Sequence, residues 1–319
     1  MEKLIAAKIE TMLAALATWM LACAIAPPLQ AEQLIWKQIQ IEGKQRRSLI
    51  DRPASFDDAY GRSVLLVIHG FGSNPSTART EMGFSKLNNR DDFIFVFPEG
   101  SGPDPNELSW NAGFCCRSAM QNGVDDVNFL DQVLDMLMTE MHIDRRRVYV
   151  AGFSNGAHLA YRWGAARSQT VAGIAAVAGA IGGRASFFAP EVRISNPKQP
   201  VSLLVVHGKE DLSFPYEGGA SLAIRPGLRG RRSVSVPDSI SFWKRNDGCI
   251  GEPQISKTAG EGSLQRFAQC LNGTAVEAWT FARLGHEWPK QLDQLVSRPF
   301  VTEYMLEFFR RHPKVAEAP

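Results

Sequence analysis

Short, almost entirely apolar runs recur along this chain, and longer stretches with helical periodicity separate them. Such runs are typical of parallel strands that are buried on both faces of a sheet. They are Ser63–Ile68, Phe93–Phe97, Val148–Ala151, Val171–Val177 and Val201–Val206. The alternation of strands and helices predicts an α/β fold, in which helices cover both faces of a mainly parallel central sheet.

Other elements follow from local patterns. Leu34–Ile41 alternates polar and apolar residues, which predicts an early strand. Apolar residues recur at helical spacing from Phe129 to Met141, and Asp125 or Asp126 can cap the start of that helix. The remaining expected elements are helices at Asn155–Trp163 and Val301–Arg311, and a hairpin of Leu264–Cys270 with Ala275–Phe281.

Three segments have little periodicity: Ser101–Asn122, Gly182–Pro200 and the Gly/Arg-rich Gly218–Val236. We expect them to be loops that meet the substrate, because binding residues are often carried by loops on a rigid scaffold. No Gly/Ser-rich or Pro-rich linker interrupts the chain after residue 31. Residues 32–319 therefore predict one domain.

Composition and charge exclude several classes of protein. Hydrophobic residues make up 45% of the 319 residues and charged residues 21%, which excludes a disordered chain. The 35 Lys and Arg nearly balance the 33 Asp and Glu, so the net charge of +2 gives no electrostatic case for a nucleic-acid partner. Neither paired C-x-x-C motifs nor a close histidine pair is present, so the sequence predicts no metal site, and it implies no organic cofactor.

The first 31 residues have the character of a signal peptide. A weakly basic start precedes the apolar run Leu13–Ala26, and Pro27 and Pro28 then end any helix. Small residues allow cleavage after about residue 26 or 31. The alternative is an uncleaved membrane anchor. Either way the sequence predicts export, to the periplasm or the extracellular space.

Export bears on the cysteines outside this leader, which number four. In an oxidising compartment an even number of cysteines favours disulfides. Cys249 and Cys270 flank the predicted hairpin and are the favoured pair, worth about 3 kcal/mol in a chain-entropy model. For the adjacent Cys115 and Cys116, a vicinal bridge and free thiols both remain open.

The sharpest chemical signal is Gly152-Phe153-Ser154-Asn155-Gly156. It follows a predicted strand and opens a predicted helix, which is the context that a G-x-S-x-G nucleophile motif requires. Glycines two residues either side of Ser154 permit a tight turn that exposes the hydroxyl at the end of the sheet. Ser154 is therefore the predicted nucleophile.

A serine hydroxyl needs a base, and the base needs an orienting acid. In this architecture the chain order is Ser, then Asp or Glu, then His. His286 lies in a Gly/Pro-flanked loop after a predicted strand, whereas His312 ends the last helix. Asp211 follows the apolar run Val201–Val206 and is the predicted acid, with the adjacent Glu210 as its rival.

The developing oxyanion needs hydrogen-bond donors. One N–H comes from the residue after the nucleophile and the other from the loop after an earlier strand, so we assign Asn155 and Phe71. Phe71 lies in His69-Gly70-Phe71-Gly72, directly after Ser63–Ile68. The same reasoning leaves His69, His158 and His207 as packed, hydrogen-bonded supports.

These motifs together resemble the α/β-hydrolase fold and, within it, the polyhydroxybutyrate-depolymerase and feruloyl-esterase-like group of secreted esterases. The resemblance spans roughly residues 45–310. The stretches that carry it are His69–Gly72, Trp110–Cys116, Gly123–Val127, Gly152–Gly156, His207–Asp211, Pro215–Gly219, Trp243 with Asn246 and Cys249, and Gly285–Pro289. The chain departs from the group at Arg283-Leu284 and in the Gly227–Arg232 insertion.

The resemblance implies a secreted serine esterase that forms an acyl-enzyme. Its substrate would be a feruloyl or acetyl ester of polysaccharide, or a hydroxyalkanoate oligomer. Trp110, Trp288 and Tyr216 are the expected substrate contacts. The cluster Arg229–Arg232 is interpreted as a solvated loop, with contact to an acidic group on the substrate as the alternative. A peptidase on the same fold and a catalytically silent binding module are the rival functions, and the oligomeric state is not predicted.

Overall fold

The computed structural model describes residues 33–53, 61–88, 90–224, 229–257, 262–289 and 300–315. The predicted signal peptide and its cleavage sites lie outside the described residues. Residues 33–319 form one compact unit. Among the described residues no helix is long and apolar enough to cross a membrane.

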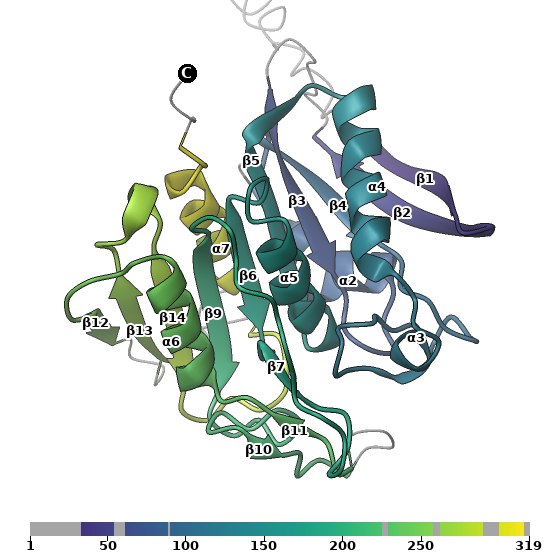
Figure 1. Ribbon diagram of the computed structural model, residues 1–319. Helices are drawn as coiled ribbons and strands as arrows, with labels where there is room; N and C mark the ends of the chain where they lie inside the picture. The colour runs from purple at the N-terminus through teal and green to yellow at the C-terminus, as the bar shows by residue number, and fades with distance from the viewer. Residues whose placement is uncertain are drawn as a thin grey trace, which may run out of the picture. The chain divides into compact units, whose positions relative to one another are not determined.

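A large sheet forms the centre of this unit and confirms the predicted α/β class (Figure 1). The strand order is β1 (Gln33–Ile41), β2 (Lys44–Arg52), β4 (Phe93–Pro98), β3 (Arg62–Ile68), β5 (Ile143–Phe153), β6 (Gly173–Val177), β9 (Ser202–Gly208), β14 (Val276–Phe281), β13 (Gly262–Phe267) and β12 (Gln254–Lys257). The pairs from β4 to β14 are parallel, and the outer pairs on both sides are antiparallel. All five apolar runs lie in the parallel part, as predicted.

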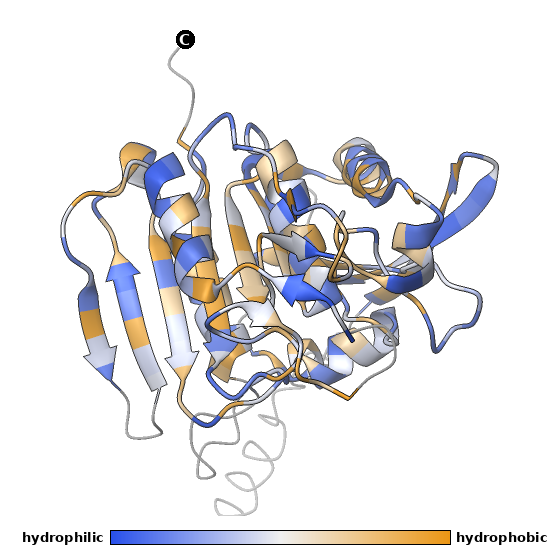
Figure 2. Ribbon diagram, turned by 60° about the horizontal axis from the view of Figure 1, so that its bottom comes forward, coloured by the Kyte–Doolittle hydropathy of each residue, from blue (hydrophilic) through white to orange (hydrophobic). Residues whose placement is uncertain are grey.

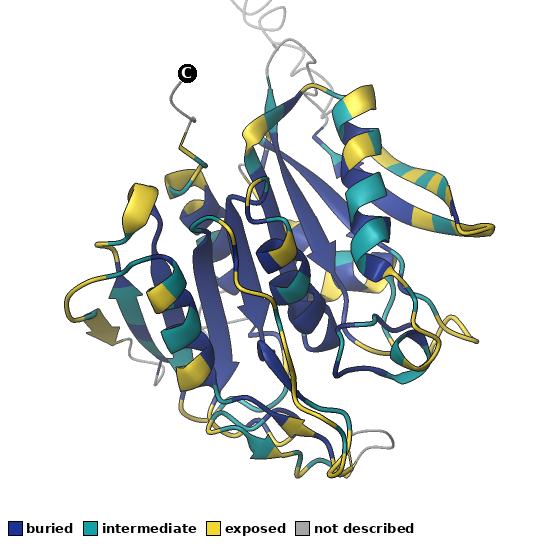
Figure 3. Ribbon diagram, viewed as in Figure 1, coloured by how far each residue is buried: buried dark blue, intermediate teal, exposed yellow. Residues whose placement is uncertain are grey.

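Helices cover both faces of the sheet, and the sheet divides the hydrophobic core into two layers. One layer contains α4 (Asp126–Glu140), α5 (Asn155–Ala166) and α6 (Val236–Asn246), and the other contains α2 (Pro75–Glu81) and α7 (Phe300–Arg311). The strands β4, β6 and β9 are buried along their whole length, and β5 is buried over Val148–Gly152 (Figure 3). The helices carry both hydrophilic and hydrophobic residues, as expected when one side faces the sheet (Figure 2).

The structure shows which of the two adjacent aspartates caps the start of α4. Asp125 is the N-cap, and its side chain accepts a hydrogen bond from the backbone N–H of Asn128 at 3.0 Å. Asp126 is instead buried and pairs with Arg46 at 2.9 Å, while it also accepts the N–H of Asn111 at 2.7 Å. Burial raises the pKa of Asp126 despite the nearby Arg46 charge. This residue therefore anchors the loop that contains Asn111.

The prediction of three loops was wrong for parts of Gly182–Pro200 and Gly218–Val236, because these two segments contain short strands. Parts of these two segments form a second, four-stranded sheet in the order β10 (Gly219–Ala220), β11 (Arg232–Ser233), β7 (Gly182–Arg184) and β8 (Val192–Arg193). Strands of two or three residues are too short to show periodicity in a sequence. This small sheet lies beyond the carboxyl ends of β6 and β9 (Figure 1).

The remaining short elements are the helix α3 (Arg117–Gln121), which lies in the predicted loop Ser101–Asn122, and the 3-10 turns η1 (Phe84–Lys86) and η2 (Leu271–Gly273). The structure joins Cys249 to Cys270 in a disulfide, as the sequence favoured. It also joins Cys115 to Cys116, which is one of the two alternatives that the sequence left open.

Candidate active site

Ser154 lies at a sharp turn between β5 and α5. Its backbone has φ 55° and ψ −119°, a left-handed conformation that is unusual for a residue with a side chain. The turn requires glycine on both sides of the serine. A Cβ at Gly152 would lie 2.3 Å from the carbonyl oxygen of Gly156, and one at Gly156 would lie 2.2 Å from that of Ile68.

The structure brings together the three side chains that the sequence singled out as nucleophile, base and acid. His286 Nε2 lies 2.8 Å from Ser154 Oγ, and His286 Nδ1 lies 2.8 Å from Asp211 Oδ2. The parallel register explains how distant residues meet, because Gly208 of β9 pairs with Phe281 of β14. Loops that leave those paired ends emerge at the same edge of the sheet.

Asp211 is buried, yet its surroundings favour the charged form. Its Oδ1 accepts the backbone N–H groups of Ser213 and Phe214 at 2.8 and 2.9 Å. Its Oδ2 lies 2.8 Å from His286 Nδ1 and 3.3 Å from His207 Nε2. Burial alone would raise the pKa of Asp211, but the hydrogen bonds of the two histidines, the charge of His286 and the N–H of Phe214 together lower that pKa. The rival, Glu210, is exposed.

The loop predicted to help hold the oxyanion lies beside Ser154. A Cβ at Gly70 would lie 3.5 Å from Cβ of Ser154. In the described residues the backbone N–H groups of Phe71 and Asn155 donate to no other group. Both remain predicted donors to the oxyanion.

His69 holds this loop in place. Its Nδ1–H donates to the carbonyl oxygen of Gly70 at 2.8 Å, and its Nε2 accepts the N–H of Gly100 at 3.0 Å. Burial lowers the pKa of His69 to about 4, so the ring is neutral near pH 7. Both ring nitrogens are occupied by backbone groups, which is the structural role that we expected.

His158 and His207 are also buried among backbone partners. His158 Nδ1 accepts the N–H of Ala180 at 3.0 Å, and burial lowers its pKa to about 3. His207 Nε2 donates to the carbonyl oxygen of Phe214 at 2.8 Å. The contact of His207 with Asp211 was not predicted, because nothing in the sequence shows which buried ring faces the acid.

One of the three expected substrate contacts is corrected by its burial. Trp110 is fully buried, and its indole N–H donates to the carbonyl oxygen of His69 at 2.9 Å. It therefore anchors the loop behind the reaction centre and offers no surface to a substrate. Trp288 is 6% exposed and donates to Thr302 Oγ1 at 3.3 Å, and its contact with substrate stays a prediction.

Tyr216 is half-buried, and its hydroxyl lies 3.3 Å from Thr280 Oγ1. Its contact with substrate remains a prediction. Asn155 has a further role that the sequence did not show: its side chain exchanges two hydrogen bonds with the backbone of Trp110, at 2.8 and 3.0 Å. The residue that follows the nucleophile is thereby fixed from behind.

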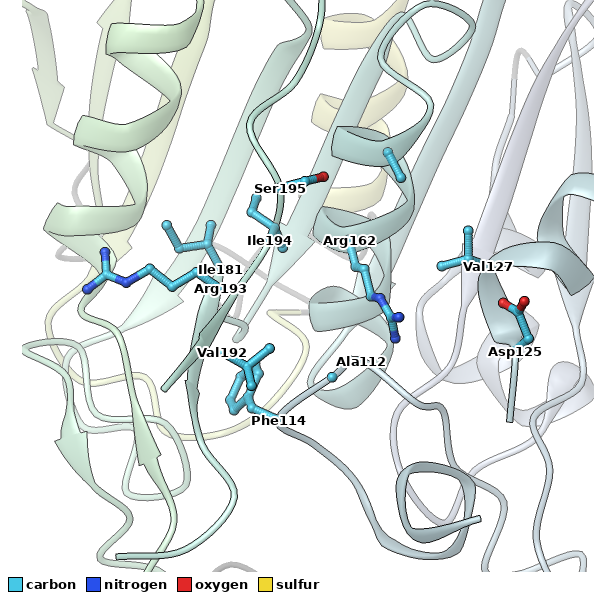
Figure 4. Close-up of a pocket in the computed structure, with 12 residues that line it drawn as sticks. Ala112, Phe114, Asp125, Val127, Arg162, Ile181, Val192, Arg193, Ile194 and Ser195 are labelled. Atoms are coloured by element: carbon cyan, nitrogen blue, oxygen red, sulfur yellow. The ribbon is translucent and has the colours of Figure 1, made fainter. Parts of the chain in front are cut away.

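The structure contains a cavity of about 440 Å³ (Figure 4). Phe114, Arg162 and Val192 are among its lining residues, and Ser154, Asp211 and His286 are not. Arg162 Nη1 donates to the carbonyl oxygen of Asn111 at 2.7 Å. In the described part of the chain, no three His, Cys, Asp or Glu side chains gather into a possible metal site.

The curated proteins that this chain resembles include feruloyl esterases and a polyester depolymerase. The chain is 24% identical over 247 residues to feruloyl esterase B of Piromyces equi, which covers 76% of this chain but only 42% of that esterase. It is 26% identical to feruloyl esterase D of Neurospora crassa, over 91% of this chain and 89% of that protein. It is 24% identical to poly(3-hydroxyalkanoate) depolymerase C of Paucimonas lemoignei, over 71% of this chain and 55% of that protein.

Among solved structures, an acetyl xylan esterase from Aspergillus awamori superposes with a TM-score of 0.57, over 87% of this chain and 99% of that one. At 12% sequence identity this likeness shows the fold. The family model for phospholipases and carboxylesterases matches residues 57–223. This match includes Ser154 and Asp211, and the hydrogen bonds described above add His286 from outside it. The chain belongs to the phospholipase/carboxylesterase family and has the α/β-hydrolase fold.

Proposed function

We propose that this protein is an exported serine esterase in which Ser154, His286 and Asp211 act as a catalytic triad. The observation that carries the proposal is the unbroken hydrogen-bonded chain from Ser154 Oγ through the His286 ring to Asp211, with 2.8 Å at each link. The family membership and the names of the relatives support ester hydrolysis as the reaction.

In the first half of the reaction, Ser154 Oγ attacks the ester carbonyl and His286 Nε2 takes the hydroxyl proton. The negative charge moves to the former carbonyl oxygen, where the N–H groups of Phe71 and Asn155 hold it. Asp211 stabilises the imidazolium through Nδ1. His286 then passes its proton to the leaving alcohol, and the acyl group remains on Ser154.

In the second half, water attacks the acyl-enzyme while His286 again accepts a proton. The collapse of this second intermediate releases the acid and returns the proton to Ser154. Each step needs a charged Asp211, because a neutral acid would not favour the imidazolium. The two backbone N–H groups that bond Asp211 Oδ1 help to keep it charged.

The proposed substrates follow the names of the relatives: feruloyl or acetyl esters of polysaccharide, or hydroxyalkanoate oligomers. Export is proposed from the leader-like first 31 residues. The Cys249–Cys270 disulfide supports it, because such bonds persist in oxidising compartments.

The test is turnover by purified wild-type protein and by Ser154→Ala. The panel would contain 4-nitrophenyl esters of increasing acyl length, methyl ferulate, and a 4-nitroanilide of the best acyl group. We expect the wild type to cleave esters well and the anilide poorly, and Ser154→Ala to cleave neither. A better rate on the anilide would favour a peptidase. Absence of turnover in the wild type would favour a silent binding module.

A further inference from the structure

A buried guanidinium lies close to the proposed reaction centre and takes no part in the mechanism above. Arg231 directly precedes β11, and only 4% of its surface is exposed. Its Nη1 lies 2.7 Å from Cys115 Sγ and 2.9 Å from Cys116 Sγ. Disulfide sulfur is at best a weak hydrogen-bond acceptor. The guanidinium of Arg231 is therefore held by two weak hydrogen-bond acceptors.

A second donor of Arg231 has no partner in the described part of the chain. Its Nε is buried and makes no hydrogen bond there. None of the ion pairs between described residues involves Arg231. Burial, followed by the charge of Arg117, lowers the pKa of Arg231 to about 10. Burial of a cation near a second cation costs free energy unless an anion compensates the charge.

Arg231 is also close to the groups proposed to hold the oxyanion. Cys115 Sγ, which Arg231 contacts, lies 3.9 Å from the side-chain nitrogen of Asn155. The guanidinium of Arg117 lies over the Phe71 ring, 4.9 Å from its centroid. Arg117 thus contacts Phe71, and Cys115 alone separates Arg231 from the side chain of Asn155.

The surroundings of Arg231 would strengthen its interaction with an anion. Phe114, Cys115, Cys116 and Phe214 form a separate buried apolar cluster. The Phe214 ring centroid lies 5.5 Å from that of His286, so the cluster extends to the proposed base. Charges next to such a surface are screened less than charges in water.

We infer that Arg231, seated on the Cys115–Cys116 pair, is an anion-binding subsite, and that the preferred ester carries a carboxylate near the bond that is cleaved. This inference rests on the proposed esterase function and narrows its substrate class. A planar guanidinium is suited to bind a carboxylate through two parallel hydrogen bonds. Half-esters of dicarboxylic acids and acylated hydroxy acids both have this chemistry.

Two matched pairs of substrates test the inference and locate the carboxylate. The first pair is the mono-4-nitrophenyl ester of glutaric acid and 4-nitrophenyl pentanoate, which differ by a carboxylate on the acyl side. The second is 3-acetoxybutanoate and its methyl ester, which differ by a carboxylate on the alcohol side. The measured quantity is the ratio of kcat/KM for the charged member to that for the neutral member.

We expect the wild type to favour the charged member of at least one pair, and Arg231→Gln to reduce that ratio about 10- to 100-fold. Arg231→Lys keeps the charge but not the planar fork, so it should retain part of the preference. The matched control is Arg232→Gln, which removes an exposed guanidinium from the next position and should keep the wild-type ratio.

A separate measurement on the wild type covers the case in which Arg231→Gln does not fold. Glutarate should inhibit hydrolysis of 4-nitrophenyl pentanoate competitively, and the uncharged glutaramide should not. The inference is overturned if the wild type favours neither charged ester, if the preference survives in folded Arg231→Gln, or if the two additives inhibit equally. Each of these results would leave esterase activity intact, whereas failure of the proposed function would abolish turnover of all four esters.

Discussion

Two buried aspartates at opposite ends of β9 show how this fold separates chemistry from stability. Asp211 follows the carboxyl end of the strand, and Asp247 lies at its amino end, where Oδ1 accepts the N–H of Val201 at 3.1 Å. Asp211 receives hydrogen bonds on both oxygens, and its pKa is lowered. Asp247 Oδ2 has no partner in the described part of the chain, and burial raises the pKa of Asp247 to about 7.

Burial alone therefore does not decide the charge of a carboxyl group. The hydrogen-bond donors around the two oxygens also determine which form is favoured. At the carboxyl edge, backbone N–H groups and two imidazoles hold Asp211 charged, which is the form that a triad needs. At the amino edge, Asp247 and the Cys249–Cys270 disulfide lie together, since Leu271 N–H donates to the carbonyl oxygen of Asp247 at 2.8 Å. That edge serves stability.

The largest expected effect comes from changing the acid at the carboxyl edge. Asp211→Asn removes the charge that stabilises the His286 imidazolium and should lower kcat by about 10⁴. Glu210→Gln, at the exposed neighbouring position, is the matched control and should change kcat little. Steady-state kinetics on a 4-nitrophenyl ester measures both. A large loss in Glu210→Gln, with Asp211→Asn active, would show that the acid has been misassigned.

The next effect should appear at the amino edge as stability and not as rate. Replacement of both Cys249 and Cys270 by serine should lower the free energy of unfolding by about 3 kcal/mol, because the disulfide restricts the unfolded chain. Denaturant unfolding with matched m-values gives this difference. The kcat of the folded variant should stay close to wild type. A loss of kcat comparable to that of Asp211→Asn would show that the amino edge also affects catalysis.

A smaller effect on rate is expected at His207, a positioning residue for Asp211. His207→Phe removes a hydrogen bond that helps to lower the pKa of Asp211, and it should reduce kcat about 10-fold. The readout beyond rate is rescue by a side chain that keeps a donor: His207→Gln should retain more of kcat than His207→Phe, because its amide N–H can still bond Asp211 Oδ2. Equal losses of kcat in the two folded variants would mean that His207 only packs.

The smallest expected effect is a pH-dependent difference in stability at Asp247. Its pKa is about 7 in the folded state and about 3.9 in an unfolded chain. Between these values the native state holds a proton that the unfolded state releases, so wild-type stability falls as pH rises through this window. Asp247→Asn cannot ionise, so its melting temperature should exceed that of wild type by a few degrees at pH 8 and converge with it near pH 4. The same difference at both pH values would contradict the raised pKa.

The carboxyl edge could be predicted from sequence because each of its parts has a local signal. The glycines around Ser154 report a tight turn, and the apolar run before Asp211 reports a buried strand. Parallel strands then force the following loops to one edge, which brings His286 within reach. Two local patterns and one rule of topology were sufficient to predict that the three side chains meet.

The rest depends on tertiary packing, which leaves no local pattern. The strands of the small sheet are two or three residues long, so no period can appear. Trp110 was expected at the substrate and is instead buried, because its indole N–H finds the carbonyl oxygen of His69. Arg231 belongs to a cluster that was interpreted as solvated, and only the structure shows that this one member is buried against Cys115 and Cys116.

The central claim is that His286 activates Ser154. The most direct measurement is the second-order rate of labelling by a fluorophosphonate probe, with the modified residue identified by peptide mass. We expect rapid labelling of the peptide that contains Ser154, at least about 10³-fold slower labelling in His286→Ala, and none in Ser154→Ala. Labelling of Ser154→Ala, or an equal rate in folded His286→Ala, would contradict the claim.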